Sequence, residues 1–421
     1  MRQPKILTTC REYSWSLFSA DLLAGITVAM VAIPLSLAIA IASGADPAKG
    51  LVTAIIGGFF ISLLGGSRVQ IGGPTGAFIV VVFGVIAEHG YDGLLVATFM
   101  AGLILLIAGY FRLGRLIAHV PESVVNGFTI GIGIIIATSQ IKDFLGLSID
   151  KVPADFIAKV PALWHAIDSF NMAAFGIAVA TLILIVLLRK WLPRFPGLIF
   201  AVGIGSAVVV FLGLPVDSIA SRFGALPGTL PVPSLPDLSF SRLAELLPSA
   251  LVIAFLAGVE SLLSAMVADR MIQGHHRPNA ELLAQGFANV ASSIFGGLPA
   301  TGAIARTATN VSAGGKTPVA GIVHALVILI VMMIAAPLAG YLAMPAMAAL
   351  LMLTAWRMSE PHKWAGYMAE PVSDRVLLLI TLALTVLVDL AVAIGVGVAI
   401  GLALKLRNGK PPPSDWTVPE R

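Results

Sequence analysis

The chain has 421 residues, of which 58% are hydrophobic and 11% charged, and its mean hydropathy is +0.96. Soluble domains are far more polar, so this composition excludes a soluble enzyme or binding module and predicts a polytopic, all-α membrane protein. The formal net charge of +4 indicates no nucleic acid partner, because basic residues gather at membrane edges for a simpler reason. The first partner that we expect is therefore the lipid bilayer.

Fourteen apolar segments follow one another, seven in each half of the chain. In the first half they span about 18–43, 50–64, 75–87, 94–111, 124–141, 173–188 and 197–212. In the second half they span about 247–268, 282–295, 302–312, 319–336, 345–356, 376–388 and 391–406. The third and tenth fall well short of the ~20 residues that a helix needs to cross a bilayer. We expect these two to be half-helices that begin near the midplane.

Seven is an odd number, so the second set of spans must enter the membrane from the side opposite to the first. This pattern predicts a 7+7 inverted repeat. The expected organisation is a cytoplasmic N-terminus (1–17), a first repeat (18–212), an external linker (213–246), a second repeat (247–406) and a short cytoplasmic tail (407–421). The linker is rich in proline, which favours an irregular connection.

Lysine and arginine support this topology, because cytoplasmic loops are enriched in them. With both termini inside the cell, the outer loops hold only Lys49, Lys142, Lys151, Lys159, Arg222 and Arg242. Nearly all other basic residues fall on the inner side. We therefore expect a multi-pass protein of the cell's inner (plasma) membrane with both termini in the cytoplasm.

The tripeptide Thr-Gly-Ala occurs twice, at 75–77 and 301–303, each time after a break rich in glycine and proline. The copies are 226 residues apart, and the same offset carries Pro34, inside the first apolar segment, onto Glu260, inside the eighth. A repeat with interrupted segments at matching positions indicates the binding site of a transporter. Taken alone, such Thr-Gly pairs could instead be helix caps and packing contacts.

Four ordered stretches resemble the SulP anion transporters, the bacterial relatives of the animal sulfate, chloride and bicarbonate exchangers. They are 65–78 (GGSRVQIGGPTGAF), 260–264 (ESLLS), 279–289 (NAELLAQGFAN) and 295–306 (FGGLPATGAIAR). The resemblance spans nearly the whole chain. It implies a core domain and a gate domain of the inverted seven-plus-seven type, with substrate held between the third and tenth helices.

Two half-helices whose N-termini meet at the midplane present unpaired N–H groups and two positive dipole ends, which form an anion site. The two threonines could add hydroxyl donors or cap the helices, and the two glycines would let a ligand approach the backbone. The phenylalanine that follows the first motif could wall this site or simply pack. The residues that we predict to bind the anion are Thr75, Gly76, Ala77, Phe78, Thr301, Gly302, Ala303 and Arg306.

Arg306 is the one basic residue that no loop or tail accommodates. Charges inside membranes are costly and usually functional. It could supply a positive charge near the anion, at the position where the resembling family has a matching arginine. The alternatives are a structural ion pair or a side chain that snorkels to the inner surface.

Glu260 is a carboxylate near the middle of an apolar segment, and Ser264 lies one helical turn away on the same face. In the resembling family the corresponding acidic residue belongs to a cation site beside the substrate. A carboxylate there could hold a proton or ligate sodium. The alternative is a structural ion pair with Arg306.

The chain departs from the resembling family at two places. Leu35 follows Pro34 where many sulfate carriers have a glutamine, so their substrate preference does not transfer. The sequence also stops at Arg421, without the C-terminal STAS domain that most members carry; either the protein is naturally short or this domain was removed.

We predict a secondary active transporter, not an enzyme, that moves bicarbonate, sulfate or a small dicarboxylate by alternating access. A single carboxylate and one serine are few ligands for sodium, which favours proton symport. Sodium-coupled bicarbonate symport and anion exchange stay open, and a nucleobase carrier or an anion channel fits less well. No cofactor is expected beyond a coupling proton or sodium ion, and a homodimer is allowed for.

Overall fold

The computed structural model describes residues 3–9, 13–114, 121–149, 152–153, 155–192, 196–388 and 390–408. This part of the chain is almost entirely helical, with one short pair of strands. Seven of its helices are at least 18 residues long and apolar enough to cross a membrane. The predicted class, an all-α polytopic membrane protein, is confirmed.

All fourteen predicted apolar segments correspond to helices. The first half contains α1 (Ile6–Thr9), α2 (Trp15–Ala42), α3 (Pro47–Leu64), β1 (Gly72–Gly73), η2 (Gly76–Phe78), α4 (Ile79–Tyr110), α6 (Glu122–Leu145), α7 (Phe156–His165), η3 (Ile167–Ser169), α8 (Met172–Trp191) and α9 (Gly197–Leu212). After the linker helix α10 (Ile219–Phe223), the second half contains α11 (Phe240–Ile272), α12 (Pro278–Ile294), β2 (Thr301–Gly302), α13 (Ile304–Ser312), α14 (Val319–Ala339), α15 (Met344–Met358), η4 (Pro361–Lys363), α16 (Trp364–Ala369), α17 (Val372–Leu387) and α18 (Leu390–Asn408).

Local sequence explains several helix boundaries. Ser14 caps α2 by accepting the N–H of Leu17 at 3.3 Å. Asp46 caps α3 through the N–H of Ala48 at 2.8 Å, with Pro47 at the first helical position. The third and fourth predicted segments form one helix, α4, which is interrupted at Gly90. That residue has φ 73°, which glycine adopts without strain.

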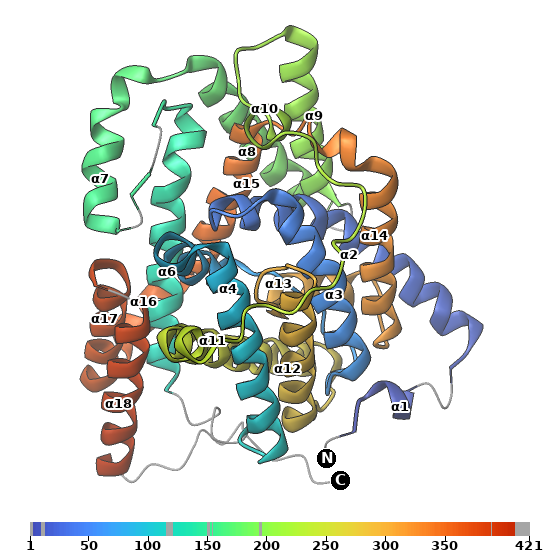
Figure 1. Cartoon of the computed structure of the whole chain (residues 1–421), viewed down its shortest axis with the longest axis vertical. Coiled ribbons are helices and arrows are strands. Elements are labelled where there is room, and N and C mark those ends of the chain that lie inside the picture. Colours follow the sequence, from blue (N-terminus) through green and yellow to red (C-terminus); the bar gives the residue numbers. More distant parts are fainter. Residues whose placement is uncertain are drawn as a thin grey trace.

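The helices pack in two groups. The core group comprises α2, α3, α4, α11, α12, α13 and α14 with both strands, and its members contact mainly one another. The gate group comprises α6, α7, α8, α9, α15, α17 and α18. In Figure 1, α17 and α18 lie along the left edge and α8 and α9 at the top, while α3, α12 and α13 lie nearer the centre. This division matches the expected core and gate domains.

The two halves of the chain interlock inside the core group. The first two spans of the first half, α2 and α3, pack against α14 of the second half. Reciprocally, the first two spans of the second half, α11 and α12, pack against α4 of the first half. This exchange is consistent with an inverted repeat in which each half completes the other.

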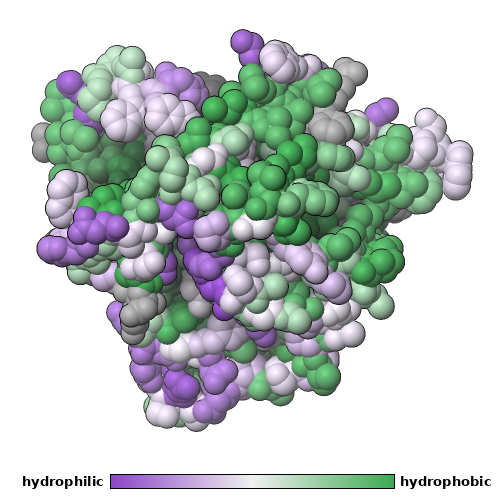
Figure 2. Space-filling view, turned by 90° about the horizontal axis from the view of Figure 1, so that it is seen from above, coloured by the Kyte–Doolittle hydropathy of each residue, from purple (hydrophilic) through white to green (hydrophobic). Residues whose placement is uncertain are grey.

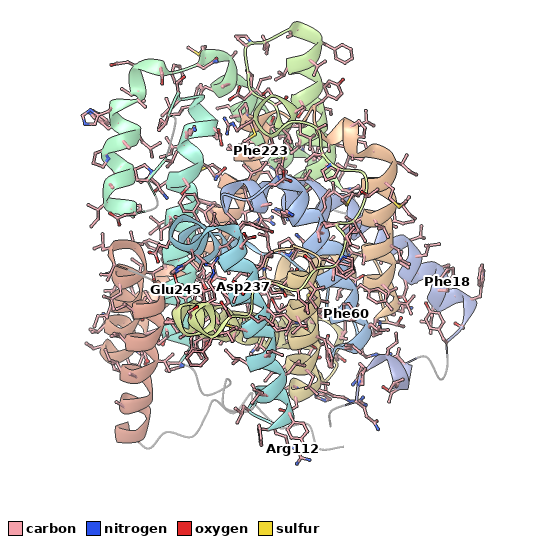
Figure 3. The ribbon with its side chains drawn as sticks, viewed as in Figure 1. Phe18, Phe60, Arg112, Phe223, Asp237 and Glu245 are labelled. Atoms are coloured by element: carbon pink, nitrogen blue, oxygen red, sulfur yellow. The ribbon has the colours of Figure 1, made fainter. Side chains whose placement is uncertain are left out.

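The linker between the halves is shorter than predicted. It begins after Leu212 as expected, but α11 starts at Phe240 and not at Leu247. The first turns of α11 include Ser241, Arg242 and Glu245 and lie before the predicted apolar run, yet they continue the helix. Glu245 there contacts His89 of α4 at 2.9 Å. Figure 3 shows the linker crossing the molecule from Phe223 at the top to the centre.

The N-terminal segment lies against one end of the core group. The N–H of Lys5 donates to the carbonyl of Gly65 at 2.8 Å, and the Lys5 ammonium donates to the carbonyl of His275 at 2.9 Å. Arg277 of the same loop reaches the carbonyl of Gln3 at 3.0 Å. Loops that were all predicted to be cytoplasmic therefore meet at one end of the molecule. Most of the predicted tail, 409–421, lies outside the described residues.

The outer surface is apolar over large areas. Side chains such as Phe211, Ile334 and Met333 are strongly exposed. On the face in Figure 2, hydrophobic residues cover much of the upper part, and hydrophilic ones gather towards the lower end. In water such exposure would be unfavourable, whereas in a bilayer it is what helices present to lipid.

Candidate functional site

The two Thr-Gly-Ala motifs meet at one place. β1 and β2 pair antiparallel, with Gly72 opposite Gly302 and Gly73 opposite Thr301. The N–H of Ala303 extends the pairing by donating to the carbonyl of Ile71 at 2.8 Å. Two segments far apart in the sequence thus lie side by side between the core helices, and we call this pair of strands the strand crossing. The expectation that the motif copies lie together is met, although Thr301 pairs with Gly73 and not with Thr75.

A helix begins directly after each strand. Thr75 is extended (φ −127°, ψ 158°) and η2 starts at Gly76, while Ala303 is extended and α13 starts at Ile304. The first N–H groups of a helix have no acceptor within it and carry its positive dipole end. Ile304 is 38% exposed at the start of α13. Two positive helix ends therefore flank the strand crossing.

Arg306 lies behind this crossing. Its side chain is 1% exposed, and Nη2 donates to Ser36 Oγ at 3.0 Å and to the carbonyl of Pro74 at 3.1 Å. Nε and Nη1 have no acceptor among the described residues. The burial contradicts a snorkelling side chain, and no ion pair to Glu260 is present within this part of the chain. A buried guanidinium with free donors is suited to an anion.

Glu260 approaches the same crossing from α11. Its Oε2 accepts a hydrogen bond from Thr75 Oγ1 at 2.8 Å, and the side chain is half-buried. Ser264, predicted to share its cavity, is fully buried, and its Oγ lies 3.3 Å from Thr307 Oγ1. Glu260 thus contacts the first motif directly, while Ser264 joins α11 to α13.

In the second motif, the threonine and the glycine that we predict to contact the anion make close contacts within the protein. The Thr301 hydroxyl is fully buried and donates to the carbonyl of Ala257 at 2.9 Å, so it ties β2 to α11. A Cβ on Gly302 would lie 1.5 Å from Gln70 Nε2. The glycine is therefore required by the Gln70 amide, which occupies the space that we expected a ligand to use.

The first motif faces the gate group. A Cβ on Gly76 would lie 3.1 Å from Met358 Sδ, with Ile136 and Thr354 close behind. Ala77 and Phe78 are 7% and 2% exposed and belong to the main hydrophobic cluster. Of the two roles considered for Phe78, packing is the one that these contacts support.

Sequence reasoning missed a second buried carboxylate, Glu281 of α12. It is fully buried, and all its partners are donors: the N–H groups of Gly66 and Ser67 at 2.8 and 3.2 Å, and the side chains of Ser261 and Gln285, each at 3.2 Å. Four donors satisfy an ionised carboxylate and offer no acceptor for a proton. Glu281 therefore anchors the loop before β1, whereas Glu260 has one hydrogen-bond partner, Thr75, among the residues that the structure describes.

Gln70 and Ser36 were missed as well. Gln70 Nε2 donates to Ser261 Oγ at 2.9 Å, so the Glu281 network reaches the strand crossing. Both residues lie in apolar or glycine-rich runs, where a buried polar side chain is itself a signal. Their partners come from the other half of the chain, which no local pattern identifies.

Comparison with known proteins decides the family. A profile described as "Sulfate permease family" matches residues 18–381. The chain belongs to the sulfate permease family. Its relatives are transporters of inorganic anions and not enzymes.

Individual relatives agree with this assignment. The "Putative sulfate transporter YvdB" of Bacillus subtilis is 45% identical over 378 residues, which cover 90% of this chain and 71% of that protein. The bicarbonate transporter BicA of Picosynechococcus is 31% identical over 338 residues, 78% of this chain and 59% of its own length. This chain thus spans 59–71% of these two relatives.

The fold agrees too. The solved transmembrane domain of a cyanobacterial BicA superposes with a TM-score of 0.82 at 31% identity and covers 90% of this chain and 98% of that domain. This supports the fourteen-segment architecture independently of the motifs.

Proposed function

We propose that this protein is a secondary active transporter of a small oxyanion, sulfate or bicarbonate, and that the anion binds at the strand crossing. The observation that carries the proposal is the antiparallel pairing of β1 and β2, which brings two helix N-termini and Arg306 to one place. The relatives named as sulfate and bicarbonate transporters support this choice of substrate. A small dicarboxylate would present the same charge chemistry.

The coupling ion that we favour is a proton on Glu260. Arg306 donates to the carbonyl of Pro74, and Glu260 accepts from the hydroxyl of Thr75, so opposite charges reach neighbouring residues from two helices. Protonation of Glu260 would leave Arg306 uncompensated and so strengthen anion binding. By linkage, the bound anion would strengthen proton binding equally. Such reciprocity is what a symporter requires.

Alternating access follows from the two packing groups. The core group carries both motifs, and the gate group contacts Gly76 from the other side of the interface. Movement of one group past the other would expose the site to each side of the membrane in turn. We expect this to occur in the plasma membrane with both termini in the cytoplasm, and a homodimer is compatible with it.

Two alternatives fit less well. A nucleobase carrier would need side-chain hydrogen bonds for a planar neutral ring, whereas the described site is positive and made of helix ends. Sodium-coupled symport is the closer competitor, because backbone carbonyls could complete a cation site around Glu260. The choice between proton and sodium is made by experiment.

Uptake of radiolabelled sulfate, bicarbonate and fumarate into proteoliposomes tests the proposal. We expect sulfate or bicarbonate to accumulate when an inward proton gradient is imposed, and to do so without sodium. Accumulation that needs a sodium gradient would show that sodium, and not the proton, is the coupling ion. Passive, gradient-independent flux at channel rates would overturn the transporter mechanism.

A further inference from the structure

A buried lysine outside the candidate site joins the core and gate groups. Lys159, on the short gate helix α7, is 3% exposed. Its ammonium donates to Ser139 Oγ of α6 at 2.9 Å. Within the described ranges, no carboxylate lies within ion-pair distance of it. A buried ammonium without an ion pair is unusual, and nothing in the local structure of α7 requires a lysine at this position.

The same ammonium lies over a ring of the core group. Lys159 Nζ is 5.6 Å from the centroid of Phe83 on α4, a cation–π contact. A Cβ on Gly44, at the end of α2, would be 3.3 Å from that ring, so the ring is held between core backbone and the lysine. Phe83 lies five residues beyond Phe78, or ~7.5 Å along the helix that starts at the candidate anion site. Lys159 therefore packs over the helix that starts at the candidate anion site, and it links that helix to the gate group.

The charge of Lys159 is poorly compensated in this position. One neutral hydroxyl and one ring face replace water, and burial lowers the pKa of the ammonium, opposed by the carboxylate of Asp155. Water or an anion would stabilise the ammonium better than its present neighbours do. The arrangement thus favours exposure of the charge once Phe83 moves away.

We propose that Lys159 is the gate cation of the α7 end. It closes this entrance while Phe83 lies beneath it, and it draws anions towards the helix N-termini when the core group moves Phe83 away. The role rests on the proposed alternating-access function and adds a residue that positions the anion on entry. Lys159 would act only on negatively charged substrates and only on one side of the membrane, which the topology predicts to be the external side.

Sided kinetics test this role. Radiolabelled sulfate and bicarbonate uptake is measured in right-side-out and inside-out vesicles for Lys159→Met, Lys159→Arg and the control Lys49→Met. Lys49 is matched because its ammonium lies 5.2 Å from the Tyr91 ring, but both residues belong to the core group. We expect Lys159→Met to raise KM about tenfold from the α7 end only, equivalent to ~1.4 kcal/mol. Lys159→Arg should keep the KM of the wild type, because it keeps the positive charge, and Lys49→Met should also have the KM of the wild type. A KM raised equally from both sides, or unchanged from the α7 end, would overturn the role.

A second measurement does not depend on transport. In a background with Cys10→Ser, Ser139→Cys is labelled from the α7 end with an anionic and a cationic methanethiosulfonate. We expect the anionic reagent to be favoured about fivefold and the preference to vanish on adding Lys159→Met. A preference that survives Lys159→Met would overturn the inference. Absence of sulfate and bicarbonate transport together with a Lys159-dependent preference would overturn the proposed function alone.

Discussion

At the scale of single residues, the site is defined by two opposite charges that do not pair with each other. Arg306 contacts Pro74 and Glu260 contacts Thr75, so the backbone at the start of η2 separates them. A direct ion pair would cancel both charges and leave little attraction for an anion. In the proposed mechanism, this separation lets the protonation of Glu260 set how strongly Arg306 attracts the anion.

Glu260→Gln should remove the pH dependence of anion binding. In the wild type, affinity should rise as pH falls, by at most tenfold per pH unit for one coupled proton, because the proton cancels the negative charge near Arg306. The amide mimics the protonated form, so binding should stay tight at all pH values while proton-driven accumulation is lost. Isothermal titration with sulfate from pH 5 to 8, together with counterflow exchange, measures both quantities.

Glu245→Gln is the matched control, since Glu245 lies on the same helix but contacts His89 away from the site. It should behave as wild type. If Glu260→Gln lost sulfate binding altogether, Glu260 would be a structural part of the anion site and not its coupling group.

Arg306→Gln should weaken the binding of a divalent anion more than the binding of a monovalent one, because the lost attraction scales with the charge of the ligand. We expect the affinity for sulfate to fall roughly 30-fold and that for bicarbonate roughly fivefold. Competition binding at fixed ionic strength measures the two. Arg270→Gln, at an exposed arginine in the last turn of α11, should change neither affinity. Equal losses for both anions would indicate a packing defect.

At the scale of elements, the crossing of β1 and β2 depends on side chains packed around it. Gln70, which lies just before β1, packs against Gly302 of β2. Its amide donates a hydrogen bond to Ser261 of α11, and Ser261 in turn donates to Glu281. These contacts hold two short strands that have only a few hydrogen bonds of their own. The position of the helix ends therefore depends on buried polar packing from α11 and α12.

Gly302→Ala should destabilise the protein by about 1–3 kcal/mol and weaken anion binding, because the new Cβ would overlap the Gln70 amide. Adding Gln70→Ala should recover part of the stability by removing the overlapping atoms, a coupling that a double-mutant cycle detects. Thermal unfolding in detergent, with and without sulfate, is the measurement. Gly84→Ala serves as control, since nothing lies within 4 Å of a Cβ there. Additive effects of the two changes would argue against the contact.

At the scale of the whole molecule, the proposed alternating-access mechanism requires the core and gate groups to move past each other. Gly76 lies at that interface, where the gate residues Met358, Ile136 and Thr354 approach it. A small residue at a sliding surface permits close approach of the two groups. A larger one should act as a wedge.

Gly76→Leu should reduce turnover at least tenfold while sulfate still protects the protein against thermal unfolding, because the wedge blocks movement more than binding. Gly84→Leu, two turns further along α4 with open space around it, is the matched control. Uptake rates and sulfate-dependent melting curves separate the two effects. Normal turnover in Gly76→Leu would show that the interface does not move in the way proposed.

The sequence alone determined the class, the repeat and the family resemblance. Apolar runs of membrane length, two short segments after glycine-proline breaks, and a duplicated Thr-Gly-Ala are local patterns, and their chemistry does not depend on distant contacts. The pairing of the motif copies could be expected because antiparallel half-helices must bring their N-termini together. The isolated charges Glu260 and Arg306 could be found because lipid makes any charge within a span conspicuous.

Only the tertiary structure decided what each side chain contacts. The contacts of Thr301 with Ala257 and of Gly302 with Gln70 come from segments distant in the sequence, so only the folded chain shows them, while the predicted role of both residues in anion binding stays a prediction. Glu260 and Glu281 both lie in stretches that resemble the family. In the folded chain Glu281 is fully buried among four donors, whereas Glu260 is half-buried and accepts from Thr75, a difference that comes from long-range packing. The start of α11 likewise extends past three polar residues, Ser241, Arg242 and Glu245, because a helix continues wherever its backbone hydrogen bonds are made.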